Sequence, residues 1–189
     1  MRIFNTIILS LLVSVTANAQ IQTKFWGLEI GKEYPSLEYV ENIIKDKCKE
    51  TLIYEGSVGA FNGSFAGYTW DAILLEFSKG ETKTFQSIKY AFQSSDRDKA
   101  RKRLIELEEK LTLKYGQPIS VSQHEPNKMK YFLVWGEEDH QNVCVLQSKK
   151  TEDTFISEWL VVLQYFDKYK FVNELLQSLN QKQQEFNEL

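Results

Sequence analysis

The sequence contains few cysteines, histidines and prolines: two, two and three, respectively, among 189 residues. Two cysteines are too few for a small scaffold held by several disulfides, and two histidines offer little for a zinc site. No stretch rich in proline, serine and glycine marks a linker. The Gly-x-Ser-x-Gly and His-Glu-x-x-His motifs are also absent. The sequence therefore favours a protein without a metal, a cofactor or catalytic residues.

Long apolar runs are missing as well, apart from one at the N-terminus. Ile7–Val15 is apolar but too short to span a bilayer. Arg2 precedes it and Ala17-Asn18-Ala19 is a small-x-small cleavage site, so residues 1–19 are predicted to be a signal peptide. Gln20 would then begin the mature chain, with no cysteine there for a lipid anchor. We expect a periplasmic or secreted protein without membrane insertion in its mature form.

Residues 20–189 are predicted to form a single domain, because this length can bury a sizeable core. The chain is 42% apolar and 13% aromatic, which is typical of a folded protein. Arg2 is the only charged residue before Gln20, so the mature chain has a net charge of −4. This mildly acidic, dispersed charge argues against nucleic acid as a partner.

Capping residues and apolar spacing predict two helices. Ser36 is expected to cap the first, whose inward positions are Leu37, Val40, Ile44 and Cys48. Ser95 is expected to cap the second, which Gly116 and Pro118 would end. The buried stripe of the second helix is predicted to comprise Ala100, Leu104, Leu107, Leu111 and Tyr115. A closing helix is expected after Asp167.

Several segments rich in β-branched and aromatic residues predict strands. They are residues 52–54, 61–77, 82–92, 130–135, 143–147 and 155–166. The order of helices and strands predicts an α+β fold, with an antiparallel sheet covered by helices on one face. We expect two αβββ pseudo-repeats, Lys24–Phe92 and Ser95–Asp167, followed by the C-terminal helix.

Four short motifs occur in a characteristic order. They are Phe25-x-Gly27, Gly63-Ser64-Phe65-Ala66-Gly67-Tyr68, Lys114-Tyr115-Gly116-Gln117-Pro118 and Val162-Leu163-Gln164-Tyr165-Phe166-Asp167. Together they resemble a group of small, mostly uncharacterised exported proteins of Gram-negative bacteria. The resemblance implies an architecture similar in outline to the β-lactamase-inhibitor-protein type. The group has no established activity, so the resemblance implies no catalytic residues.

The aromatic residues Phe61, Phe65, Tyr68 and Trp70 are the candidate binding residues. Strict alternation would place Phe61 and Phe65 on one face of the sheet and Tyr68 and Trp70 on the other. An exposed aromatic side chain could stack on a sugar or anchor a protein partner. The alternative is that these rings are packed in the core.

Cys48 and Cys144 form an even pair in a chain predicted to be exported, which permits a disulfide. The alternative is two separate thiols that behave as small apolar side chains. The histidines, His124 and His140, are predicted to lie in loops. Neither is expected to bind a metal, because the ligands required for a convergent site are not evident.

The function favoured by these observations is an exported, non-enzymatic binding module that recognises a protein or glycan of the cell envelope. One alternative is an exported hydrolase with carboxylate chemistry, which predicts a deep pocket with titratable groups. Another is an envelope-assembly or inhibitor protein. An assembly protein predicts an exposed edge strand or a detached terminal helix.

Overall fold

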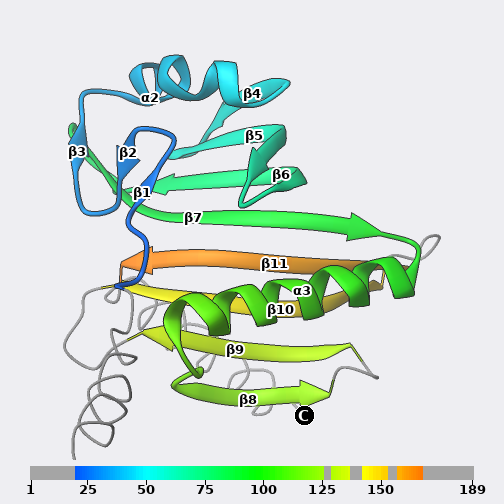
Figure 1. Cartoon of the computed structure of the whole chain (residues 1–189). Helices are drawn as coiled ribbons and strands as arrows, with labels where there is room; N and C mark the ends of the chain where they lie inside the picture. Colours follow the sequence, from blue (N-terminus) through cyan, green and yellow to red (C-terminus); the bar gives the residue numbers. More distant parts are fainter. Residues whose placement is uncertain (1–19, 126–128, 137–141, 153–156, 168–189) are drawn as a thin grey trace, which may run out of the picture.

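The computed structural model describes residues 20–125, 129–136, 142–152 and 157–167 (Figure 1). The predicted signal peptide, the turn expected around His140 and the closing helix expected after Asp167 lie outside the described residues. The described chain has an α+β fold in which antiparallel strands predominate, so the predicted fold class is confirmed at this level. No helix within it is long and apolar enough to cross a membrane.

Most of the described strands form one antiparallel sheet, in the order β4-β5-β6-β7-β11-β10-β9-β8. Their bounds are β4 Glu50–Tyr54, β5 Ser57–Phe65, β6 Tyr68–Phe77, β7 Lys83–Ser94, β8 Ser120–Glu125, β9 Lys130–Gly136, β10 Asn142–Glu152 and β11 Ser157–Asp167. The central pair, β7 and β11, joins strands that are distant in sequence. β4 and β8 therefore lie at opposite edges of this sheet.

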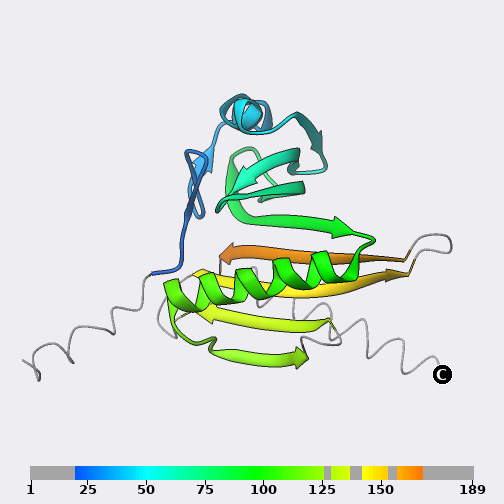
Figure 2. The ribbon, with the colours of Figure 1, turned by 45° about the vertical axis from the view of Figure 1, so that its right-hand side comes forward.

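Helix α3 (Arg97–Tyr115) lies across β7, β11 and β10 (Figures 1 and 2). Its N-cap is Asp96, whose side chain accepts from the backbone N–H groups of Asp98 and Lys99, so the predicted cap at Ser95 was one residue early. The buried stripe is confirmed in full: Ala100, Leu104, Leu107, Leu111 and Tyr115. The helix ends before Gly116, which has a positive φ of 82°.

Helix α2 (Leu37–Ile44) packs against β4 and β5. The side chain of Ser36 accepts a hydrogen bond from the Tyr39 N–H at 3.2 Å, which confirms the predicted cap. Leu37, Val40 and Ile44 are buried as expected. The helix then tightens into the 3₁₀ turn η1 (Lys45–Lys47), so Cys48 follows the helix instead of lying on it.

Two features of the sheet differ from the predicted strands. The predicted single strand over residues 61–77 is part of a hairpin, because Ala66 and Gly67 have positive φ values of 55° and 81° and reverse the chain between β5 and β6. The polar segment Ser120–Glu125 forms β8, a strand that the apolar pattern did not predict. Each described helix is therefore followed by four strands, where three were predicted.

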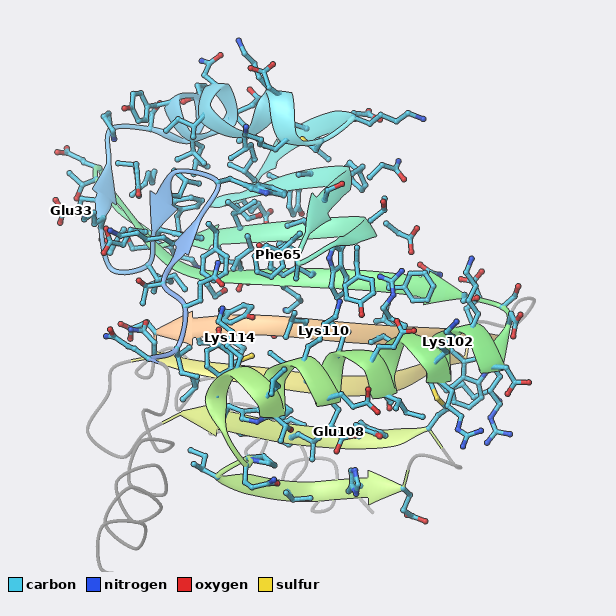
Figure 3. All side chains as sticks on the ribbon, viewed as in Figure 1. Glu33, Phe65, Lys102, Glu108, Lys110 and Lys114 are labelled. Atoms are coloured by element: carbon cyan, nitrogen blue, oxygen red, sulfur yellow. The ribbon has the colours of Figure 1, made fainter. Side chains whose placement is uncertain are left out.

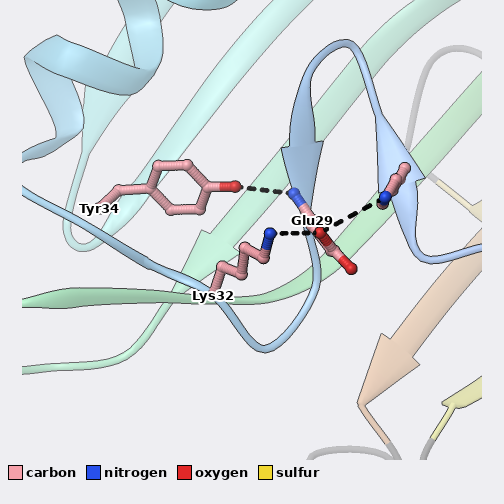
Figure 4. A network of polar contacts seen from close by, with 4 residues as sticks. Glu29, Lys32 and Tyr34 are labelled. Atoms are coloured by element: carbon pink, nitrogen blue, oxygen red, sulfur yellow. Dashed lines mark hydrogen bonds and ion pairs between the residues drawn. The ribbon is translucent and has the colours of Figure 1, made fainter.

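The N-terminal segment forms three short strands, β1 (Lys24–Phe25), β2 (Leu28–Glu29) and β3 (Glu33–Tyr34). The Glu29 carboxylate lies 2.7 Å from Lys32 Nζ and 3.9 Å from Lys24 Nζ (Figure 4). The Glu29 N–H donates to the Tyr34 hydroxyl at 2.7 Å. The hydrogen bond with Lys32 lowers the pKa of Glu29. These contacts fix the loop that places Phe25 in the core.

The core has two parts, because successive side chains of a strand point to opposite faces of a sheet. The larger part includes the buried residues of α2 and α3 together with Cys144 and Leu146 of β10. The smaller part lies on the opposite face and comprises Val134, Val143, Val145 and Phe166, with Phe132 packed against it. The sheet is therefore apolar on both faces at β9–β11.

Candidate functional site

The structure separates Phe61 from the other three candidate aromatic residues. Phe65, Tyr68 and Trp70 all pack against the larger core, whereas Phe61 lies on the other face of the sheet, close to Gly59. The predicted strict alternation is wrong here. Asn62 has a φ of 53°, in the left-handed region. This conformation interrupts the alternation of side chains, so the residues after Asn62 point to the opposite face from the one that strict alternation gives.

Trp70 is entirely buried and lies in an aromatic cluster that we define as Phe25, Phe65, Trp70, Tyr90 and Tyr165. Phe65 stacks on Tyr90 with 4.3 Å between ring centroids, and Trp70 lies 5.4 Å from Tyr90. The Trp70 indole N–H donates to the Phe65 carbonyl at 3.1 Å. Trp70 is thus part of the core, while Phe65 and Tyr68 are only half-buried.

Tyr68 brings the aromatic cluster into contact with α3. The Arg103 guanidinium lies 4.3 Å from the ring centroid of Tyr68, and Lys110 Nζ lies 4.1 Å from the same centroid. Arg103 is also 4.3 Å from the ring of Phe92, and its Nη1 donates to the Thr69 carbonyl at 3.2 Å. Cations are attracted to the negative face of an aromatic ring. The rings therefore hold two positive charges at one place on the surface.

Two further lysines extend these charges along α3. We define the cationic stripe as Lys99, Arg103, Lys110 and Lys114, whose spacing places them on one side of the helix. Figure 3 shows Lys110 and Lys114 on the side of α3 that faces Phe65, with Glu108 on the other side. Within the described residues, no member of the stripe lies within salt-bridge distance of a carboxylate.

Two carboxylates lie near the cationic stripe. Glu106 accepts a hydrogen bond from the Tyr68 hydroxyl at 3.2 Å and is 3.9 Å from Lys102, which is outside the stripe. Asp71 accepts from the Gln93 N–H at 2.7 Å. Partial burial lowers the pKa of Arg103, with these two carboxylates opposing the shift. A partly desolvated guanidinium gains more from an anionic ligand than a fully hydrated one does.

A second polar group lies on the opposite side of α3. Both carboxylate oxygens of Glu108 are in contact: Oε1 is 2.8 Å from His124 Nε2, and Oε2 accepts from the Tyr131 hydroxyl at 2.6 Å. We call Glu108, His124 and Tyr131 the polar tether. Burial and the hydrogen bond to Glu108 raise the pKa of Tyr131 well above its ordinary value. The predicted loop position of His124 is wrong, because this residue lies in β8.

Both cysteines are free thiols in the structure. Cys48 donates to the Ile44 carbonyl, whereas Cys144 is fully buried between Trp135 of β9 and Tyr165 of β11 in the sheet register. Burial raises the pKa of both thiols, which disfavours the reactive thiolate. Among the described residues, no three His, Cys, Asp or Glu side chains are grouped as metal ligands.

Reasoning from the sequence missed Arg103, Lys110 and the polar tether. The stripe has a sequence signal, since positions i, i+4, i+11 and i+15 of a helix share one side. The polar tether has no such sequence signal, because the contact of His124 with Glu108 forms only once residues 120–125 are folded as β8. No protein-family model matches the chain, and neither a curated protein nor a solved structure shows significant similarity to it.

Proposed function

We propose that residues 20–189 act as an exported, non-enzymatic binding module that recognises a protein or glycan of the cell envelope through an anionic group. The cationic stripe and the exposed edges of Phe65 and Tyr68 form the binding surface. Trp70 supports this surface from below. The proposal keeps the predicted periplasmic or secreted location and the resemblance to small exported proteins of Gram-negative bacteria.

One observation carries the proposal: four cations share one side of α3, and within the described chain none of them lies within salt-bridge distance of a carboxylate. The chain as a whole has a net charge of −3, so four cations on one side of a helix are a local departure from its average charge. Two of them hydrogen-bond to neutral groups: Arg103 donates to the Thr69 carbonyl and Lys114 to the Gln22 side chain. Like charges on one surface repel each other, and an anionic ligand relieves that repulsion. Electrostatic complementarity also speeds association and excludes partners of the wrong sign.

The aromatic rings add contact area that does not depend on charge. Phe65 and Tyr68 lie at the end of the β5–β6 hairpin, beside the stripe. Tyrosine provides a rigid apolar ring with a polar tip, a combination that suits both sugars and protein side chains. A ligand with an anionic group and an apolar or sugar face would contact both parts of this surface.

The test is a titration of the mature chain with two soluble polysaccharides of similar length, polyanionic heparin and neutral dextran. We expect heparin to bind and dextran to bind at least tenfold more weakly. Heparin affinity should fall as salt is raised, because surface charge interactions are screened. Lys110→Gln should weaken binding by about fivefold, since one exposed ion pair contributes up to about 1 kcal/mol.

Lys79→Gln is the matched control, because Lys79 is an exposed lysine in the turn between β6 and β7, away from α3. It removes the same charge and should leave heparin affinity unchanged. Equal weakening by both variants would show that only net charge matters and would refute the stripe as the site. Equal binding of dextran and heparin would refute recognition of an anion.

A hydrolase with carboxylate chemistry remains the alternative for the polar tether. The geometry favours a structural role, because the two oxygens of Glu108 are occupied by His124 and Tyr131. Hydrolysis by paired carboxylates needs a second Asp or Glu placed across the substrate from the first. In the described chain the side chain of Glu108 instead contacts His124 and the buried Tyr131 phenol, and neither is a carboxylate.

We also propose that the two halves are pseudo-repeats whose helices cover the same face of the sheet. Two observations support this. α2 and α3 are each followed by four antiparallel strands, and the last strands of the two sets, β7 and β11, pair with each other. Residues buried on both helices also belong to one continuous core cluster.

A further inference from the structure

The edge strand β4 exposes apolar side chains. It pairs only with β5 among the described strands. Leu52 and Tyr54, which share one face of the strand, are 57% and 63% exposed. Glu50, at its start, is the only charged residue of β4, and the strand contains no lysine or proline. Edge strands that remain unpaired usually carry such residues or a bulge, because unpaired backbone groups attract further strands.

The opposite edge of the sheet has that protection. The register of β8 shifts between Val121 and Gln123, which is a bulge or irregularity in the pairing with β9. Bulges twist an edge and interrupt the regular row of N–H and C=O groups. In addition, His124 holds β8 to Glu108 of α3. The pairing of β4 with β5, by contrast, runs without a register shift from Glu50 to Tyr54.

The β4–β5 turn determines which backbone groups of β4 face outward. Glu55 and Gly56 form a two-residue turn with positive φ values of 37° and 84°, so Tyr54 and Ser57 are a hydrogen-bonded pair. Hydrogen-bonded and non-hydrogen-bonded pairs alternate along an antiparallel ladder. The N–H and C=O groups of Thr51 and Ile53 therefore point away from β5, toward the open edge.

A second β4 strand, related by a two-fold axis at Leu52, fits this edge. Thr51 of one copy would exchange hydrogen bonds with Ile53 of the other, and the two Leu52 side chains would meet at the axis. If the register continues one residue beyond each end of β4, Lys49 of one copy would lie near Glu55 of the other copy's turn, and both residues are exposed. The strand is thus complementary to itself in backbone donors, in apolar contact and in charge.

We propose that two copies of this chain associate through antiparallel pairing of β4 with β4, which joins their sheets into one. The occupant of this edge is a second copy because the register that satisfies the outward backbone groups also pairs opposite charges. This inference stands apart from the cationic stripe, which lies on α3. The two proposals can therefore fail independently.

The first test is sedimentation velocity of the mature chain from about 1 to 500 μM. We expect a reversible monomer–dimer equilibrium. Leu52→Lys should shift it at least tenfold toward monomer, because two lysines would meet at the axis. A monomer across the whole range would overturn the proposal, even if a strand from another protein bound the edge.

Charge exchange tests the register. Lys49→Glu and Glu55→Lys should each weaken the dimer, since each places like charges opposite one another. The double variant Lys49→Glu/Glu55→Lys should restore it. Additive weakening in the double variant would overturn the proposed register.

Cross-linking gives a readout that does not depend on affinity. Leu52→Cys places two thiols at the axis, where the Cβ atoms of a non-hydrogen-bonded pair are about 4.5–5.5 Å apart, close to disulfide distance. In Tyr54→Cys the two thiols are about four residues apart along the strands, too far to bond. Mild oxidation should give covalent dimers of the first variant only. Equal cross-linking of both would refute the pairing.

Discussion

The two ends of the sheet are held by different kinds of contact. At the β5–β6 end, the aromatic cluster fills the space beneath the hairpin, with Trp70 fully buried and Phe65 stacked on Tyr90. At the β8–β9 end, hydrogen bonds join the sheet to α3. There Tyr131 donates to Glu108, and the Trp135 indole donates to the Gly116 carbonyl at 3.0 Å.

The two ends of the sheet should therefore be sensitive to different kinds of substitution. The aromatic end is stabilised by contact area and close packing. Changes in side-chain volume should therefore lower the free energy of unfolding most at that end. The polar end relies on particular hydrogen-bond donors and acceptors that are partly buried. The loss of a single donor or acceptor atom should therefore lower the free energy of unfolding at that end.

Trp70→Ala should destabilise the protein by about 3–5 kcal/mol, because it leaves a large cavity in the aromatic cluster. The free energy of unfolding from urea titration measures this loss. Tyr54→Ala is the control, since Tyr54 is 63% exposed and its truncation should cost little in a monomer. Equal losses in the two variants would show that Trp70 is not a core residue.

Gly63→Ala should destabilise by about 1–3 kcal/mol through overpacking. A Cβ at this position would lie 2.7 Å from Ile73 Cδ1 and 3.0 Å from the Trp26 ring. Gly59→Ala in the same strand is the matched control, because its Cβ would make only ordinary contacts, the nearest at 3.6 Å. Thermal unfolding of both variants would reveal the difference, and a neutral Gly63→Ala would contradict the tight packing described.

Tyr131→Phe should cost about 1–2 kcal/mol, although the ring keeps its shape. The change removes the hydroxyl that donates to Glu108 at 2.6 Å and leaves that carboxylate with one fewer partner. Urea unfolding again measures the loss. Tyr39→Phe serves as the control, because Tyr39 is an exposed residue of α2. No loss at Tyr131 would mean that the polar tether does not stabilise this end.

Tyr90→Phe makes the same chemical change at the aromatic end and should have the opposite sign. The Tyr90 hydroxyl is buried and has no hydrogen-bond partner within the described chain. Removing a buried polar group that lacks a partner relieves a desolvation cost, so we expect stabilisation of about 0.5–1 kcal/mol. Urea unfolding beside Tyr131→Phe measures it directly. Destabilisation would indicate a partner for this hydroxyl.

The sequence was most informative where local rules apply. The buried stripe of α3 and the Ser36 cap follow from spacing and from residue type, and both were predicted. The switch of face at Asn62 could not be predicted, because asparagine adopts a positive φ only in particular contexts. β8 was missed for a related reason: its residues are polar, and its pairing with β9 defines it as a strand.

For the candidate site too, local sequence patterns predicted some features and missed those that depend on contacts between distant segments. The aromatic residues were identified from their number and spacing, but their burial depends on how the β5–β6 hairpin folds back toward α3. Arg103 and Lys110 belong to a helix that was predicted, yet nothing local relates them to Tyr68, which lies in β6. Contacts between elements distant in sequence therefore account for most of what was missed.

The position of β11 determines the order in which the sheet can be completed. It is the last described strand in the chain, yet it lies in the middle of the sheet, between β7 and β10. A chain that emerges from its N-terminus first exposes β7 as an open edge until β11 arrives, after α3 and three further strands. Such long-range pairing slows folding and prolongs exposure to aggregation. Completion of the fold is thus a late kinetic event that depends on residues 157–167.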